Sequence, residues 1–366
     1  MIGRPVGRPC QRGGEGYSVT ELTVEELRAL WRHRRTDLDW NCLFVLPPWL
    51  GAWLGTLGAG ERPLLRAVWR AETLLGVAPL LCRGDTVRFL GSPDVCDYQD
   101  FVLAPGGRAG EKDAERFFQV LLFHLRESGV RRADLGPVRP DSAARRGLRA
   151  AAEREGWAVS WEPEGVAAER DLPPTWEAFL EGLGKRERHE VRRKLRRLEE
   201  AGGGRFRRAP TEPAGSAGEG AERFLGLLSG YRADKTAFLD PARRAFFRQL
   251  LAETAREGLL NLGFLDVEGE TAAGVLCFDY RGTTYLYNNG YDPRWESLSV
   301  GILSKVWSIR DSIARGMRRY DFLKGDEEYK RRLGGRRVPL ARCRLSLSGA
   351  GSPPARSGAK GGGAPR

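Results

Sequence analysis

The hydrophobic and polar positions between Thr283 and Lys330 predict a strand, a helix, a second strand and a short helix. The first strand is expected over Thr284 to Asn288, and a polar turn follows it. The helix is expected over Val300 to Ala314, because its apolar residues recur at spacings of 4, 3 and 4 and so lie on one face. The residues of this stripe are Ile302, Val306, Ile309 and Ile313. A glycine ends the helix, and the second strand covers Arg319 to Leu323.

Two halves of the chain repeat the same kind of pattern. Each half contains a run of three strands, and the middle strands are similar: TLLGVAPLLCR from Thr73 and TAAGVLCFDYR from Thr271. Each run leads on to a helix and a further strand, so we predict two structurally similar domains. This order, with mixed and mostly antiparallel pairing, predicts an α+β architecture in which helices flank each sheet.

Further elements are expected along both halves. Thr23 and Glu26 form a capping-box pattern that predicts a helix to His33. The other expected strands are 64–70, 73–83, 87–91, 132–135, 157–163, 205–209, 259–267, 271–280 and 337–347, and the other helices are 111–128, 141–155, 185–201, 222–232 and 241–257. A linker is expected at 210–220. The predicted domains are 17–165 and 166–347, with disordered tails at 1–16 and 348–366.

Composition and charge indicate which kinds of partner and reaction the protein can have. The 366 residues include 60 Lys and Arg against 48 Asp and Glu, a net charge of +12. This balance favours an anionic partner, although the Arg-rich termini also account for it. No apolar run is long enough to cross a membrane and no signal peptide is recognisable, so a cytoplasmic location is expected. Six cysteines without a C-x-x-C pair and only three histidines favour neither a metal site nor a Ser-His-Asp mechanism.

The start of the predicted helix at Val300 is a candidate anion site. Ser297, Ser299 and Gly301 leave backbone N–H groups unpaired there and place little side-chain bulk above them. Many helices begin with Ser and Gly for capping alone, and both interpretations stay open on these residues.

Three motifs in the C-terminal half resemble those of a known enzyme family. They are YNNGYDPRW (287–295), SVG (299–301) at the start of a helix, and RGMRRYDFLKGDEEYK (315–330). Together they resemble the C-terminal signature of the CelD or BioF-like acetyltransferases, bacterial relatives of the FemAB peptidoglycan aminoacyltransferases within the GNAT superfamily. The likeness extends over most of 41–333, through the segments 41–50, 97–103, 192–206 and 224–251.

The resemblance implies two tandem GNAT-like domains and N-acyltransferase activity. The implied donor is acyl-CoA, such as acetyl-CoA, and the implied acceptor is an amine of a sugar, polymer precursor or small metabolite, in exopolysaccharide or cell-envelope synthesis. Of the spaced glycines that bind the donor pyrophosphate in ordinary GNAT enzymes, only Gly301 remains. Two alternatives stay open: a FemAB-like aminoacyltransferase that uses aminoacyl-tRNA on a cell-wall precursor, and a non-catalytic module that binds an anionic ligand.

Residues for donor binding and proton transfer are expected in the same stretch. The backbone amides of Ser299, Val300 and Gly301 are expected to hold the donor phosphates. Acyl transfer also needs a group that accepts a proton and one that donates it. The candidate bases are Asp292, Asp326 and Glu327, and the candidate acids are Tyr287 and Tyr329. Each tyrosine is also compatible with an ordinary core position.

Lys330 is the main catalytic candidate, because the resemblance implies an aromatic residue and a lysine against the donor. Its ammonium is expected to neutralise charge on the transferred carbonyl or to bind a terminal phosphate. The alternative is a solvated surface lysine. Substrate-binding candidates are Asp97, Tyr98, Trp49 and Asn288; Asp97 and Tyr98 alternatively only end a strand.

The basic helix from Lys185 also has two interpretations. Its sequence carries a stripe of Val191, Leu195 and Leu198, which is typical of a salt-laced amphipathic helix. Its many arginines alternatively predict an electrostatic track for tRNA or another anionic polymer.

Overall fold

The computed structural model describes residues 16–105, 108–210, 214–229 and 239–347. The chain divides into two compact units that are interleaved in sequence. Unit 1 consists of the described parts of Met1–Val45, Arg62–Glu164 and Leu340–Arg366, and unit 2 of those of Leu46–Glu61 and Gly165–Pro339. The predicted domain ranges, 17–165 and 166–347, differ from these units at segments 46–61 and 340–347. The predicted tails, 1–16 and 348–366, lie outside the described residues except for Gly16.

Unit 1 is built on a mixed sheet. Strands β2, β3 and β4, the predicted run of three strands, form an antiparallel meander, and β1 pairs antiparallel with β2. Strand β6 joins β4 in parallel, the C-terminal part of β13 joins β6 antiparallel, and the short β5 pairs with β3. The bounds are β1 Tyr17–Glu21, β2 Pro63–Arg70, β3 Thr73–Arg83, β4 Thr86–Phe89, β5 Val102–Leu103, β6 Arg132–Val138 and β13 Arg336–Leu347.

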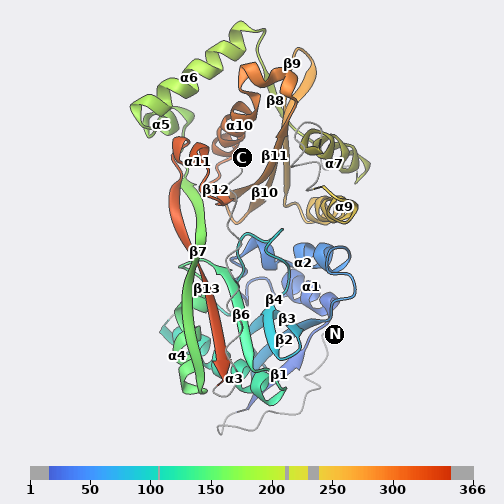
Figure 1. The fold of residues 1–366 in the computed structure, drawn as a ribbon, viewed down its shortest axis with the longest axis vertical. Coiled ribbons are helices and arrows are strands. Elements are labelled where there is room, and N and C mark those ends of the chain that lie inside the picture. Colours follow the sequence, from blue (N-terminus) through green and yellow to red (C-terminus); the bar gives the residue numbers. More distant parts are fainter. Residues whose placement is uncertain (1–15, 106–107, 211–213, 230–238, 348–366) are drawn as a thin grey trace, which may run out of the picture. The chain divides into compact units, whose positions relative to one another are not determined.

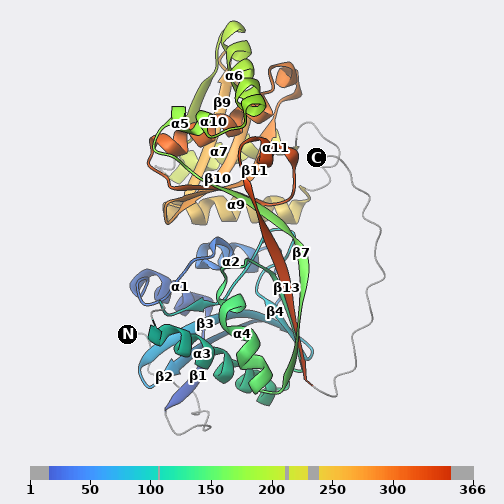
Figure 2. The same cartoon turned by 90° about the vertical axis from the view of Figure 1, so that its left-hand side faces the viewer.

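The first helix of unit 1 begins where its capping residues predict. In α1 (Val24–His33) the Thr23 hydroxyl accepts from the Glu26 amide at 3.1 Å, and the Glu26 carboxylate accepts from the Thr23 amide at 2.7 Å. Helices α3 (Arg108–Glu127) and α4 (Ala143–Arg154) lie side by side on the sheet (Figure 2). Their apolar faces, with Phe117, Phe118 and Leu148, form the core of the unit. A single 3₁₀ turn, η1 (Leu43–Val45), also belongs here.

In unit 2 the strands follow one another in the order β7-β12-β11-β10-β9-β8, with mixed pairing. Strands β8 to β11 pair antiparallel in chain order, β11 and β12 pair in parallel, and β12 and β7 pair antiparallel. The bounds are β7 Trp157–Asp171, β8 Arg205–Arg208, β9 Leu260–Val267, β10 Glu270–Tyr280, β11 Thr283–Tyr291 and β12 Arg319–Lys324. The sequences of β9 and β10 are apolar on both faces because helices cover both sides of the sheet.

Helix α10 covers one face of this sheet, and α7 and α9 cover the other (Figure 1). The structure confirms α10 at Val300–Ala314, with Val306, Ile309 and Ile313 buried. Helix α7 begins at Ala214, inside the segment predicted to be a linker; its apolar residues from Ala221 onward are buried, and they hold the segment as a helix. The other bounds are α2 Pro47–Leu54, α5 Trp176–Glu181, α6 Lys185–Glu200, α7 Ala214–Ser229, α9 Pro241–Arg256, η2 Pro293–Leu298 and α11 Glu328–Arg332.

Candidate active site

The two parallel strands of unit 2 separate toward their carboxyl ends. They pair over only three positions, from Thr283 with Arg319 to Tyr285 with Asp321. Beyond this point β11 stays paired with β10 and β12 with β7, and the register of both pairs shifts there. Within the described residues no other strand pairs with the facing edges, so their backbone N–H and C=O groups can receive an extended ligand. Carboxyl ends of parallel strands are a common place for a binding site.

In the chain, β11 is followed by the short turn η2 and then by the start of α10. Ser299 has a left-handed backbone (φ 58°), and its hydroxyl does not cap the helix. Instead the hydroxyl accepts from the Lys194 ammonium of α6 at 3.0 Å. The Ser299 amide, which the sequence predicted to be unpaired, donates to the Glu296 carbonyl at 2.8 Å. The amides of Val300 and Gly301 have no backbone acceptor among the described residues, because the helical hydrogen bonds begin after them. This end of α10 can therefore receive an anion, with Lys194 beside it.

Packing also explains why residue 301 is a glycine. A Cβ atom added there would lie 2.9 Å from the ring of Tyr291, closer than carbon atoms approach. The glycine therefore lets Tyr291 pack against the first turn of α10. Its part in binding a phosphate stays a prediction.

Lys305 and Tyr329 form a buried cation–aromatic pair beside this turn. Lys305 is only 4% exposed, and its ammonium donates to the carbonyl of Gly301 at 2.7 Å. The ammonium lies 4.7 Å from the centroid of the half-buried Tyr329 ring on α11. Sequence reasoning missed Lys305, because it followed only the apolar stripe of α10. A lysine directly before Val306 in a helix buried on several sides was the available signal.

Lys330 is buried and holds the loop after β12. Its ammonium donates to the carbonyls of Leu323, Lys324 and Gly325 at 3.1, 2.7 and 3.4 Å, and pairs with the Glu327 carboxylate at 2.9 Å. With 3% exposure it is not the solvated surface lysine of the alternative interpretation. Its contacts support a positioning role, and a direct part in catalysis stays a prediction.

The predicted bases lie in two different loops. Asp292 is buried at the start of η2, where its carboxylate accepts from the backbone amide and the Nε of Arg294 at 2.9 and 2.8 Å. Asp326 is exposed in the loop after β12 and pairs with Arg337 at 3.1 Å. Both carboxylates thus have cationic partners, and their role as bases stays a prediction.

Tyr287 and Trp49 pack together on the face of the sheet that carries α9. The Trp49 ring lies 5.0 Å from Tyr287 and 5.3 Å from Phe278, and Tyr287 also meets Phe247 of α9 at 6.0 Å. Trp49 is 1% exposed. The Asn288 side-chain oxygen accepts from the amide of the next residue at 2.9 Å. These contacts support packing roles for Tyr287 and Trp49, on the opposite face from α10.

Asp97 and Tyr98 belong to unit 1, whereas the start of α10 belongs to unit 2. Asp97 is half-buried. Tyr98 is buried, with Phe44 at 5.1 Å and the Arg139 guanidinium at 5.2 Å from its ring. The contacts of Tyr98 are those of a core residue, and substrate binding by both residues stays a prediction.

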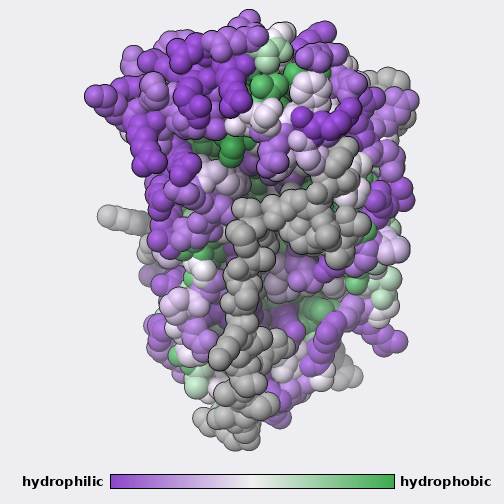
Figure 3. Space-filling view, turned by 45° about the horizontal axis from the view of Figure 1, so that its top comes forward, coloured by the Kyte–Doolittle hydropathy of each residue, from purple (hydrophilic) through white to green (hydrophobic). Residues whose placement is uncertain are grey.

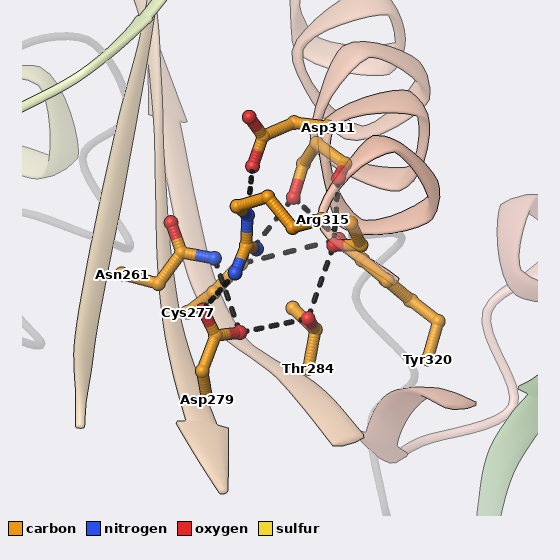
Figure 4. Close-up of polar contacts among 9 residues, drawn as sticks. Asn261, Cys277, Asp279, Thr284, Asp311, Arg315 and Tyr320 are labelled. Atoms are coloured by element: carbon orange, nitrogen blue, oxygen red, sulfur yellow. Dashed lines mark hydrogen bonds and ion pairs between the residues drawn. The ribbon is translucent and has the colours of Figure 1, made fainter. Parts of the chain in front are cut away.

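A polar network fixes the other end of α10 to the sheet (Figure 4). Arg315 donates to Asp279 at 2.6 Å and to Asp311 at 2.7 Å. Thr284 donates to Asp279 at 2.7 Å and accepts from the Ser312 hydroxyl at 3.0 Å. The network therefore joins α10 to β10 and β11 at the position where β11 and β12 are still paired.

A second branch of the network is fully buried. The Tyr320 hydroxyl donates to the Ser308 hydroxyl at 3.0 Å, and the Cys277 sulfur lies 3.6 Å from the Ser308 hydroxyl (Figure 4). Burial raises the pKa of the Cys277 thiol to about 12 and that of the Tyr320 phenol well above its ordinary value. Both groups stay neutral near pH 7, so this branch anchors the helix and supplies no nucleophile.

The described residues contain neither a metal-binding cluster nor a membrane-spanning helix. They contain no group of three or more His, Cys, Asp and Glu residues placed to hold a metal ion. In the same part of the chain, no helix has the length and apolar character needed to span a membrane.

Comparison with known proteins agrees with this geometry. Residues 185–331, which run from α6 to α11, match the family model described as acetyltransferase (GNAT) domain. No curated protein matches the sequence. Among solved structures, FemX is similar with a TM-score of 0.60 and 11% identity, over 89% of this chain and 96% of that chain.

Two further structures have the same fold. A conserved protein of unknown function from Bacteroides thetaiotaomicron has a TM-score of 0.55 and 11% identity, over 90% of this chain and 99% of that one. The C-terminal domain of a putative lysylphosphatidylglycerol synthetase from Agrobacterium fabrum has a TM-score of 0.50 and 10% identity, over 82% and 91%.

The chain therefore has an α+β fold with the tandem GNAT-like architecture that the sequence predicts. Its residues 185–331 form an acetyltransferase (GNAT) domain, which confirms the predicted resemblance to the CelD or BioF-like family. The solved structures, at 10–11% identity, show the fold alone.

Proposed function

We propose that this protein transfers an acyl group from acyl-CoA to an amine, at the opening between β11 and β12. The observation that carries the proposal is the separation of these two parallel strands inside a GNAT domain, toward the uncapped start of α10. The opening matches an extended donor that carries amide groups, and the amides of Val300 and Gly301 suit its phosphates.

The buried pair beside the opening suits the chemistry of acyl transfer. A neutral amine attacks the thioester carbonyl, a C–N bond forms, and the C–S bond breaks. The departing thiolate takes a proton from the Tyr329 phenol, the product nitrogen loses its extra proton to water, and the phenol regains a proton from water. The Lys305 ammonium, 4.7 Å from the Tyr329 ring, stabilises the negative charge that develops there. Lys330 holds the loop before α11 and so fixes the position of Tyr329.

The donor can be tested by thermal-shift titration with acetyl-CoA, free CoA and bulk charged tRNA. Acetyl-CoA at about 100 times its dissociation constant should raise the free energy of unfolding by about 2.7 kcal/mol. Lys305→Met should weaken the response to acetyl-CoA. Arg192→Gln, which alters an exposed α6 side chain, should keep it. A wild-type protein that responds to neither CoA nor tRNA would favour the non-catalytic interpretation.

An aminoacyltransferase that uses charged tRNA is the second candidate. Helix α6 exposes four cations with no acidic partner among the described residues: Lys185, Arg186, Arg192 and Arg197. Hydrophilic residues dominate the end of unit 2 that carries this helix (Figure 3). A stabilising response to tRNA that disappears with added salt, without a response to acetyl-CoA, would favour this candidate.

A further inference from the structure

A pocket lies in unit 2, outside the opening between β11 and β12. It has a volume of about 290 Å³, and its walls are the α5–α6 turn and the outer side of α11. Three guanidinium groups line it, from Arg186, Arg331 and Arg332, and we call it the arginine pocket. Arg331 and Arg332 were not candidates from the sequence, and Arg186 was one only as part of the basic helix from Lys185.

Arg170 of β7 holds the two walls of the arginine pocket together. Its guanidinium donates to the carbonyl of Phe179 in α5 and to that of Leu333 after α11, both at 3.2 Å. Each wall has a glycine against this guanidinium. A Cβ atom at Gly182 would lie 2.8 Å from it, and one at Gly334 would overlap it. The pocket is therefore built before any ligand arrives.

The charges in the arginine pocket favour an anion. Glu328 is engaged by Arg332 at 2.8 Å and by Arg331 at 3.6 Å, and the Glu187 carboxylate lies against Gly184. Arg186 has no acidic partner among the described residues. Guanidinium groups form paired hydrogen bonds with phosphate oxygens, and three of them suit a phosphoryl group better than a carboxylate with two oxygens.

The location of the arginine pocket relates it to the proposed chemistry. Arg332 follows Tyr329 by three residues, which is about one helical turn or 5 Å along α11. Arg186 precedes Lys194 by eight residues, so it lies roughly 12 Å along α6 from the contact with Ser299 at the start of α10. A phosphoryl group in this pocket is thus near the proposed proton donor and apart from the proposed donor-phosphate site.

We propose that the arginine pocket binds the phosphoryl group of the acceptor, so that the acceptor is a phosphorylated amine. This inference rests on the proposed acyl transfer, because only that reaction makes the ligand an acceptor. Binding of the phosphoryl group can be measured without any reaction. The phosphate anchors the acceptor, and its amine extends toward Tyr329.

Isothermal titration of the full-length protein with inorganic pyrophosphate, at constant ionic strength, tests this assignment. We expect saturable binding that Arg186→Gln and Arg332→Gln each weaken about tenfold, the loss of one charge-assisted contact. The matched control is Arg192→Gln, which removes the same charge from α6 outside the pocket and should change the dissociation constant less than about twofold. Unfolding curves without ligand should be the same for all four proteins.

Repeating the titration with saturating acetyl-CoA separates the two phosphate sources. An unchanged dissociation constant for pyrophosphate supports the acceptor site, and competition would assign the pocket to the donor and overturn the proposal. Absence of pyrophosphate binding, or an equal loss in Arg192→Gln, would also overturn it. Binding that depends on Arg186 in a protein that ignores acetyl-CoA would overturn the proposed acyl transfer and leave the phosphoryl site standing.

Discussion

The two tyrosines predicted as acids differ in their surroundings. Tyr329 meets a buried ammonium, and Tyr287 is packed among aromatic rings. If Tyr329 protonates the thiolate, Tyr329→Phe should lower kcat by about 10²-fold or more with little change in KM. Tyr287→Phe keeps the ring packing and should stay within about twofold of the wild type. Steady-state kinetics with acetyl-CoA and an accepted amine measure both.

The two kinetic constants separate an acid from a packing residue. Loss of the acid should act on kcat, because the proton is needed only in the transition state. A larger loss in Tyr287→Phe than in Tyr329→Phe would contradict the assignment.

Lys330 should act mainly through stability. Lys330→Met removes the donor of three loop carbonyls and should lower the free energy of unfolding by about 2–4 kcal/mol. Its neighbour Arg331 is 76% exposed, and Arg331→Met should change stability by less than about 0.5 kcal/mol. Urea denaturation compares the two. A Lys330→Met protein of wild-type stability that lost its activity would instead support direct catalysis.

Only part of the site was predictable at the residue scale. The motif around Tyr329 and Lys330 pointed to the segment after β12, which the proposed chemistry uses, and the catalytic role of this segment stays a prediction. The burial of Lys330 and the contact between Lys305 and Tyr329 depend on how α10 and α11 pack, which local sequence patterns do not contain.

At the scale of elements, the ion pair of Arg315 and Asp279 anchors the end of α10. Both side chains are largely buried, so Arg315→Met leaves the Asp279 carboxylate without its cation, and Asp279→Asn leaves Arg315 with Asp311 as its only acidic partner in the network. The cycle of Arg315→Met, Asp279→Asn and the double variant should give a coupling energy of about 1–3 kcal/mol. Denaturation curves supply all four values, and additive effects would show that the pair does not anchor the helix.

The carboxyl group of Asp100 at the start of helix α4 should make the free energy of unfolding depend on pH. The Asp100 carboxylate accepts from the amides of Ala143 and Ala144 at 2.7 and 3.1 Å, yet burial raises its pKa to about 6. The folded state then prefers the protonated carboxyl. The free energy of unfolding of the wild type, relative to Asp100→Asn, should therefore fall by about 1–3 kcal/mol as pH rises from 4 to 7. A difference that is constant or rises with pH would contradict this sign.

Most elements were predictable because their signals are local. The bounds of α10 and the capping box of α1 follow from spacing and side-chain chemistry within one helix. Strand β11 extends to Tyr291, beyond the predicted end at Asn288, because β10 pairs with it up to that residue. The network of Figure 4 was not predictable, since its members come from β9, β10, β11, β12 and α10.

At the scale of the whole molecule, two segments belong to other units than the sequence predicted: 46–61 belongs to unit 2 and 340–347 to unit 1. The apolar run 46–61 looked like part of the first domain because it precedes the first strands. In the structure its helix α2 packs against α9, and Trp49 joins the aromatic side chains of unit 2. This placement depends on long-range packing, which no local pattern records.

The place of segment 46–61 in unit 2 predicts which elements lose protection from hydrogen exchange when the Trp49 side chain is removed. Trp49→Ala deletes a fully buried ring and should cost about 3–5 kcal/mol, and the loss should appear in unit 2 although residue 49 lies near the N-terminus. Hydrogen exchange of the intact chain should show lost protection in α9 and β10, with β2 and β3 unchanged. Trp31→Ala is the matched control, because this equally buried tryptophan of α1 belongs to unit 1 and should give the opposite pattern. Lost protection of β2 and β3 in Trp49→Ala would instead place the segment 46–61 with unit 1.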